Sequence, residues 1–174
     1  GYVRNLVDLC ADLGDNGVMV FGSPKQRSST GGLTPAEATQ NFIEGMASIA
    51  DHALSRNVTL LMEALPKSQS DIVTTLEAAA GVVHAVNHPA VRTMFDTHNA
   101  EDETDPHAVV LERYFDLIRH VHVNEMDGKH PGTGDYDFVS IFKTLKRLNY
   151  QGWVSLEAFD FPTGATVSRP KPLN

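Results

Sequence analysis

The chain has 174 residues, 41% of them hydrophobic and 21% charged, with a formal net charge of -8. This balance is typical of globular proteins, and no apolar run approaches the roughly 18 residues of a membrane span, so no membrane partner is expected. The acidic charge and the lack of a basic patch argue against nucleic acid. Cys10 is the only cysteine. We therefore expect no disulfide framework, no signal peptide and a reducing, cytoplasmic setting.

Amphipathic helical patterns alternate with short apolar strands along the chain. The expected helices cover residues 2–13, 35 to about 53, about 71–86, 106–118 and 138–148, and the expected strands cover residues 18–21, 59–63, 91–96, 120–124 and 152–157. Thr34 and Glu37 form a capping box around Pro35, and Asp137 is a second helix cap. In the loop after the first strand, Lys25 and Arg27 either hold an acidic group or are solvated.

Four of the five expected strands end at a polar residue that can bind a metal or carry a proton. These residues, hereafter the strand-end cluster, are Glu63, Asp96, His122 and Glu157. Successive members are separated by roughly 26 to 35 residues, about the length of one strand-plus-helix unit. They should therefore lie at equivalent ends of successive parallel strands. Each one alone is also typical of a solvated loop residue or a helix cap, but the ordered set indicates a metal site.

Alternating strands and helices predict an α/β fold with a parallel sheet, either an open doubly wound sheet or an eight-stranded barrel. No GxGxxG or P-loop follows any strand, which counts against a nucleotide fold. In a TIM (β/α)8-type barrel the strand ends face one central site, so the strand-end cluster favours the barrel. We expect residues 1–174 to form a single domain with about the last five strand-helix units, and residues 162–174 to form a Pro-rich tail. Because such an open sheet has unpaired edges, we expect a homo-oligomer or association with another segment.

The segments LMEAL, MFDTHN, HVHVNEMDGKHPGTGDYDF and GWVSLEAF resemble the sugar isomerase and epimerase branch of the xylose isomerase-like barrels, which includes ketose 3-epimerases and hydroxypyruvate isomerases. The resemblance implies one divalent metal ion bound by the strand-end cluster, with Glu63 and Glu157 as the catalytic acid-base pair. Two departures concern the substrate. Asn99 stands where the family usually has a substrate-contacting His, and His98 lies one position earlier. Many ketose epimerases have an Arg six positions after the metal-binding His, where this chain has Gly128, followed by Lys129.

Three carboxylates and one imidazole suit Mn²⁺ best, with Mg²⁺, Co²⁺ or Zn²⁺ as alternatives. Such an ion polarises a substrate carbonyl and stabilises an enediolate, while the two glutamates transfer protons. The expected function is therefore a metal-dependent isomerase or epimerase of a small sugar, keto acid or keto-sugar derivative. The expected substrate contacts are His98, Asn99, Glu125 and Lys129. For His98 and Asn99 the alternative is a role in forming a turn, and for Glu125 and Lys129 it is a solvated loop.

Three other functions stay open. An inosose-type dehydratase would use the same chemistry but expel a hydroxyl group. A metal-dependent phosphoester hydrolase of the apurinic endonuclease type would need more metal ions and more strand-end histidines than this chain offers, and it would need to bind DNA despite the acidic charge. The last alternative is an inactive fragment that keeps the fold without the chemistry.

Overall fold

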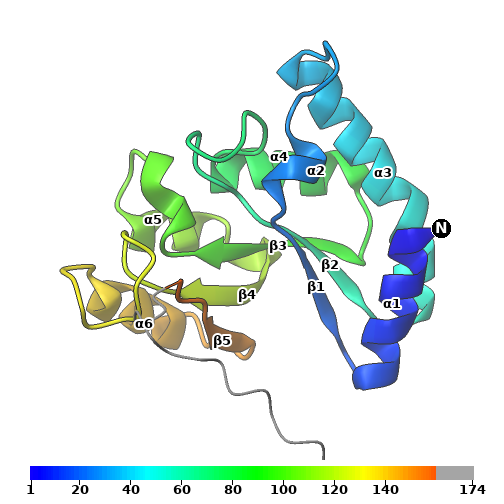
Figure 1. Ribbon diagram of the computed structural model, residues 1–174. Coiled ribbons are helices and arrows are strands. Elements are labelled where there is room, and N and C mark those ends of the chain that lie inside the picture. The colour runs from blue at the N-terminus through cyan, green and yellow to red at the C-terminus, as the bar shows by residue number, and fades with distance from the viewer. Residues whose placement is uncertain (160–174) are drawn as a thin grey trace, which may run out of the picture.

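A computed structural model describes residues 1–159, and it shows a curved sheet with helices along its outer side (Figure 1). The sheet has five strands in the order β1-β2-β3-β4-β5, and every neighbouring pair is parallel. The strands are β1 (Val18–Phe21), β2 (Thr59–Met62), β3 (Val91–Asp96), β4 (Ile118–Val123) and β5 (Trp153–Leu156). The predicted portion of a TIM-type barrel is thus confirmed as a half-barrel. The expected tail at residues 162–174 lies outside the described residues.

Helices connect the strands and cover the convex face of the sheet. They are α1 (Tyr2–Leu13), α2 (Pro24–Arg27), α3 (Pro35–Ser55), α4 (Leu76–Val86), η1 (Asn99–Asp102), α5 (His107–Arg113), η2 (Phe115–Leu117) and α6 (Phe138–Arg147). In Figure 1, α1 and α3 lie together on the outer side of β1 and β2. The predicted capping box begins α3, since Thr34 Oγ1 accepts the Glu37 amide at 3.3 Å and Glu37 Oε2 accepts the Thr34 amide at 2.8 Å.

Two expected helices have different bounds. The helix expected from residue 71 begins only at Leu76, because Thr75 is its N-cap and accepts the Ala78 amide at 3.2 Å. Asp71 instead accepts the backbone amide of Ser29 at 2.9 Å, which draws the preceding segment toward the loop after β1. The helix expected over residues 106–118 ends at Arg113. A short 3-10 turn then leads into β4, which starts already at Ile118.

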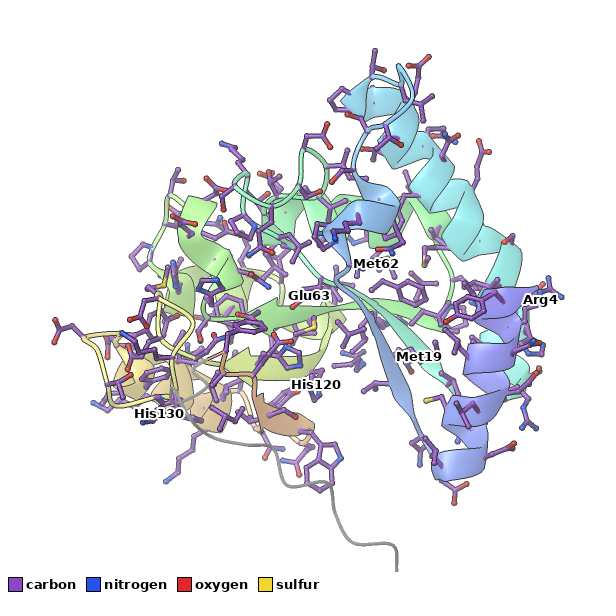
Figure 2. All side chains as sticks on the ribbon, in the orientation of Figure 1. Arg4, Met19, Met62, Glu63, His120 and His130 are labelled. Carbon is purple, nitrogen blue, oxygen red and sulfur yellow. The ribbon has the colours of Figure 1, made fainter. Side chains whose placement is uncertain are left out.

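Side chains along each strand alternate between two environments. On the convex side, residues such as Leu60, Phe95 and Val121 are buried against the helices in one continuous core. On the concave side lie the polar strand ends. Figure 2 shows this division: Met19 points toward α1, whereas Glu63 and His120 lie on the concave side. The period-two pattern therefore places every member of the strand-end cluster on the concave side.

The outermost strand leaves apolar side chains in solvent. On β5, Trp153 is 80% exposed and Leu156 is 61% exposed. Exposed apolar groups beside an unpaired strand edge favour covering by further protein, and the expected association stays a prediction. Within residues 1–159, no helix combines the length and hydrophobicity needed to cross a bilayer.

Candidate metal centre

The strand-end cluster converges on one point at the carboxyl ends of β2 to β5. Each member offers a ligand atom, and these four atoms all lie within 4.8 Å of one another. His122 Nδ1 is central: it lies 2.9 Å from Glu157 Oε2, 3.3 Å from Asp96 Oδ2 and 3.8 Å from Glu63 Oε1. The register explains this geometry, because Asp96 pairs directly with His122 across β3 and β4. The structure therefore contains a candidate metal-binding group, and its roles in binding and catalysis stay predictions.

Burial and charge shift the ionisation of the cluster. Burial, together with the charges of Asp96 and Glu157, raises the pKa of Glu63 to about 7. Burial disfavours the charged form of His122, but bonding and attraction to Asp96 and Glu157 outweigh it and raise the pKa of His122 to about 10. Burial also opposes ionisation of Asp96, yet its bonds with His122 and with the Asn99 amide lower the pKa of Asp96. A protonated imidazole thus offsets part of the negative charge when no other cation is bound.

The donor set fits a divalent cation. Asp96 Oδ2 is buried and points to the centre of the cluster, where its polar neighbour is His122 Nδ1 at 3.3 Å and no well-aligned hydrogen bond forms within the described residues. A buried carboxylate oxygen needs strong polar partners, and a cation at the centre of the cluster would be a closer and stronger partner than the imidazole. Three carboxylates and one imidazole provide oxygen and nitrogen donors of the kind that Mn²⁺, Mg²⁺ and Co²⁺ accept.

The carboxylate of Glu63 is held on two sides. Asn99 Nδ2 donates a hydrogen bond to Glu63 Oε1 at 3.0 Å. On the other side, a Cβ added at Gly22 would lie 1.6 Å from Glu63 Oε2, so only glycine leaves room for this oxygen. The residue after β1 therefore determines where the first ligand of the cluster can lie, and this requirement cannot be read from the loop sequence.

We expect Gly22→Ala to weaken Mn²⁺ binding by at least about tenfold while leaving the chain folded. The new methyl group must displace the Glu63 carboxylate, whereas the β1 core lies on the other side of the strand. Isothermal titration with Mn²⁺ and circular dichroism would check both parts. Gly45→Ala is a suitable control, because a Cβ at Gly45 meets no atom within 4 Å. Unchanged affinity in Gly22→Ala would show that Glu63 is not a ligand in its present position.

Asn124, the last residue of the strand expected over residues 120–124, joins three strand ends. Its side chain is fully buried, and its Oδ1 accepts the His98 amide at 2.9 Å and the Thr97 hydroxyl at 2.9 Å. Its Nδ2 donates to the carbonyl of Glu157 at 2.7 Å. The pattern His-x-His-x-Asn in β4 was the available indication, since a buried amide in line with two histidines must find partners.

Two expected substrate contacts follow β3 directly. The backbone amides of His98 and Asn99 both donate to Asp96 Oδ1, at 2.8 Å and 3.1 Å. These bonds form a turn around the Asp96 carboxylate. The Asn99 side chain then faces Glu63, whereas His98 Nδ1 lies 2.8 Å from the carbonyl of Met126. Asn99 therefore contacts a member of the strand-end cluster, and His98 contacts the loop after β4. Their contacts with a substrate stay predictions.

The other two expected contacts lie in the loop between β4 and α6. Glu125 is buried, and its carboxylate accepts the amides of Gly132 at 2.8 Å and Tyr136 at 3.1 Å. Lys129 Nζ forms an ion pair with Asp127 at 2.5 Å. Glu125 thus organises the loop from within, and Lys129 bonds to a neighbour in the same loop. Their expected substrate contacts stay predictions.

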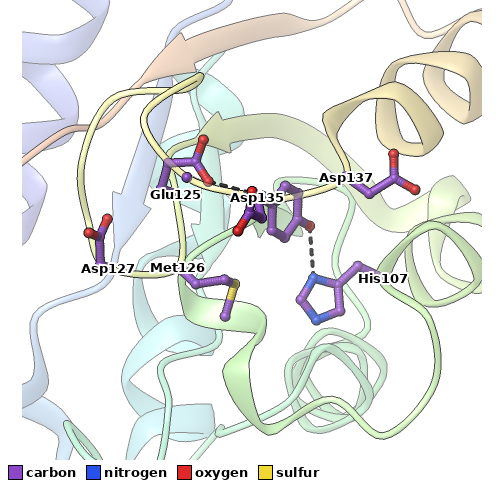
Figure 3. Close-up of a pocket in the computed structure, with 8 residues that line it drawn as sticks. His107, Glu125, Met126, Asp127, Asp135 and Asp137 are labelled. Atoms are coloured by element: carbon purple, nitrogen blue, oxygen red, sulfur yellow. Dashed lines mark hydrogen bonds between the residues drawn. The ribbon is translucent and has the colours of Figure 1, made fainter.

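A cavity of about 550 Å³ lies beside this loop, separate from the strand-end cluster (Figure 3). His107 and Tyr136 line it, and the Tyr136 hydroxyl lies 2.7 Å from His107 Nδ1. Burial lowers the pKa of His107 below its ordinary 6.5, although a bond with the Ala100 carbonyl partly opposes the shift. The surroundings of His107, including this contact with Tyr136, favour its neutral form.

Because the pKa of His107 is lowered in the folded chain, we expect the free energy of unfolding to decrease at acidic pH. The folded state binds a proton at His107 less readily than the unfolded state, so the stabilisation is present above about pH 6.5 and is lost as the pH falls below that value. When the pH is lowered from about 7.5 to about 5.5, we expect the free energy of unfolding to fall less in His107→Gln than in the native chain. Urea unfolding of both chains at the two pH values measures the difference. Equal losses would mean that the histidine does not contribute.

The sequence and the fold both have known relatives. A family model of xylose isomerase-like TIM barrels matches residues 2–172. A ketose 3-epimerase from Arthrobacter globiformis is 26% identical over 162 residues, which is 90% of this chain and 54% of the relative. An inosose dehydratase from Bacillus velezensis (strain DSM 23117 / BGSC 10A6 / LMG 26770 / FZB42) is 27% identical over 115 residues, 53% of this chain and 39% of the relative.

A crystal structure of a D-psicose 3-epimerase in the presence of D-fructose superimposes with a TM-score of 0.80 at 22% identity, covering 91% of this chain and 55% of that one. At this identity the likeness concerns the fold. The chain spans about half the length of the relatives that it matches. It therefore corresponds to a half of a barrel, as the five-stranded sheet indicates.

Proposed function

The chain belongs to the xylose isomerase-like TIM barrel family, and we propose that it acts as a divalent-metal-dependent epimerase or isomerase of a small sugar or keto-sugar. The observation that carries this proposal is the strand-end cluster, whose four ligand atoms lie within 4.8 Å of one another. The ketose 3-epimerase among the relatives supports the reaction class. The buried Asp96 Oδ2, which makes no well-aligned hydrogen bond within the described residues, supports the metal.

The proposed metal ligands are the four members of the cluster, with Mn²⁺ as the preferred ion. When bound there, the ion would supply positive charge that stabilises negative charge on adjacent substrate oxygens. The protein groups position that charge: Asn99 orients the Glu63 carboxylate, and Asn124 holds the backbone of Glu157. Metal-ligand positions fixed by such neighbours favour a defined site over a loose acidic patch.

Proton transfer is assigned to the two glutamates. Glu63 and Glu157 enter the cluster from β2 and β5, so they approach the centre from different sides. Their environments differ, since the Glu63 side chain is 7% exposed and the Glu157 side chain is 37% exposed. Two carboxylates in different environments can divide the removal and the return of a proton between them. We propose His98 and Asn99 as the residues next to the substrate.

A dehydratase is the second candidate, and the inosose dehydratase among the relatives favours it. Both reactions begin with removal of a proton next to a carbonyl group. They differ in the next step, because an epimerase returns a proton to the same carbon, whereas a dehydratase expels a hydroxyl group as water.

Proton exchange in deuterated water distinguishes the two candidates. The Mn²⁺-loaded chain would be incubated with a panel of ketohexoses and with an inosose, and the products followed by nuclear magnetic resonance and mass spectrometry. We expect deuterium at the carbon next to the carbonyl of a ketose. Loss of water from the inosose would favour the dehydratase. Neither change with Mn²⁺ bound would contradict the proposed function.

A further inference from the structure

Arg27 carries a buried charge beside the strand-end cluster. Its side chain comes from α2, the short helix after β1, and only 6% of the residue is exposed. Nη1 donates to the carbonyl of Phe21 at 3.1 Å and to the carbonyl of Glu63 at 2.5 Å. Nε and Nη2 are also buried and make no hydrogen bond within the described residues. The alternative of a solvated loop therefore does not describe Arg27.

The buried charge of Arg27 is not explained by a contribution to the stability of the fold. Burial lowers the pKa of Arg27 to about 10, so the guanidinium is still charged at neutral pH. Its surroundings include the Phe42 ring, whose centroid lies 6.0 Å from the guanidinium carbon, and Arg27 forms no ion pair within 4 Å in residues 1–159. A buried charge without a bonded counter-charge usually stabilises a fold less than an apolar side chain of similar size. The position of the charge therefore suggests a role in the site.

The two carbonyl partners lie at the ends of neighbouring strands. Phe21 is the last residue of β1, and Glu63 follows the last residue of β2. The backbone bond between them, from the Glu63 amide to the Phe21 carbonyl, is long at 3.4 Å. Arg27 adds a second connection at this point. It thereby fixes the backbone that presents the Glu63 carboxylate to the cluster.

The charge of Arg27 also has a consequence for the bound site. Three ionised carboxylates and a neutral imidazole around a divalent cation leave a net charge of about -1 in a poorly solvated place. The buried Arg27 guanidinium lies next to this place, since it donates to the carbonyl of Glu63. The positive charge of Arg27, which contacts the backbone of Glu63, would offset this residual negative charge.

We propose that Arg27 is a positioning residue of the metal site, which holds the strand end of Glu63 and offsets the excess negative charge of the loaded cluster. The inference rests on the proposed function, because it assumes that the cluster binds a divalent cation. It concerns a residue outside the ligand set, which contacts the backbone of one ligand and would act through that ligand.

The test compares Mn²⁺ affinity with metal-free stability. Arg27→Met removes the charge and the hydrogen bonds, Arg27→Gln removes the charge, and Arg27→Lys keeps it. Arg4→Met is a matched control, because Arg4 also donates to a backbone carbonyl, that of Ser48, far from the cluster. Isothermal titration measures the affinity of each chain for Mn²⁺, and thermal unfolding with chelator present measures stability without metal.

We expect Arg27→Met and Arg27→Gln to bind Mn²⁺ about 10- to 100-fold more weakly, with metal-free melting temperatures near or above that of the native chain. Arg27→Lys should recover most of the affinity, and Arg4→Met should keep it. Native affinity in Arg27→Gln, or equal weakening in Gln and Lys, would overturn the inference, and these two chains decide it if Arg27→Met does not fold. Absence of Mn²⁺ binding in the native chain would instead overturn the proposed function itself.

Discussion

A chain carrying both Glu63→Gln and His122→Asn should bind no stoichiometric Mn²⁺, whereas the native chain should bind about one ion. The two substitutions remove one charged oxygen donor and the central nitrogen donor of the strand-end cluster. Asp96 and Glu157 then remain as the two unchanged ligands, and the neutral amide oxygens of Gln and Asn replace the other two at a cost in affinity. Because outer neighbours of metal sites already change affinity by 10- to 100-fold, loss of two direct ligands should weaken binding by more than about 100-fold.

Elemental analysis of the purified chains and a Mn²⁺ titration measure this effect. The matched control is Glu101→Gln with His130→Asn, which makes the same chemical changes at two exposed residues outside the cluster. Circular dichroism without metal would check that the double variant is folded, because Glu63→Gln removes one negative charge while His122→Asn removes the imidazole that offsets it. Equal Mn²⁺ binding by the native chain and the double variant would show that the cluster is not the metal site.

Glu157→Gln should reduce deuterium exchange into a ketose by about 10² to 10⁴-fold, while Mn²⁺ binding is partly kept. Gln retains an oxygen that can bind the ion, but its amide cannot accept and return a proton. Glu157 is the most exposed carboxylate of the cluster, so it is the one that a substrate can approach most readily.

The exchange rate would be measured by nuclear magnetic resonance at saturating Mn²⁺, so that weaker metal binding does not imitate a lost proton transfer. Glu101→Gln again provides the matched control, because it neutralises one exposed carboxylate elsewhere. Unchanged exchange in Glu157→Gln would remove Glu157 from the acid-base pair. Exchange in Glu157→Gln that is slow at limiting Mn²⁺ but native at saturating Mn²⁺ would assign Glu157 to metal binding alone.

Residue periodicity predicted the architecture well because it reports a local property. Strands with period-two burial and helices with caps such as Thr34 and Asp137 were recognisable one element at a time. Helix boundaries were less predictable where a side chain near the expected start bonds to a segment distant in sequence. Asp71 accepts a hydrogen bond from Ser29 in the loop after β1, and α4 begins only after its N-cap Thr75.

The candidate site was predictable in part for the same reason. Its four members each end a strand, so parallel register brings them together once the fold class is known. Three neighbours were not predictable in their roles. Gly22, Arg27 and Asn124 act through close approach or bonds to strands distant in sequence, and a single chain pattern carries no information on such pairings.

The sequence by itself determined the alternation of elements, the parallel sheet and the identity of the strand-end cluster, because hydrophobic period and chain spacing encode them locally. Only the tertiary structure decided how the cluster is held. It placed the Glu63 carboxylate against Gly22, buried the charge of Arg27 against the Glu63 carbonyl and directed Asp96 Oδ2 toward His122 at the centre of the cluster. These features depend on distances between segments that burial brings together, and burial is a property of the folded chain as a whole.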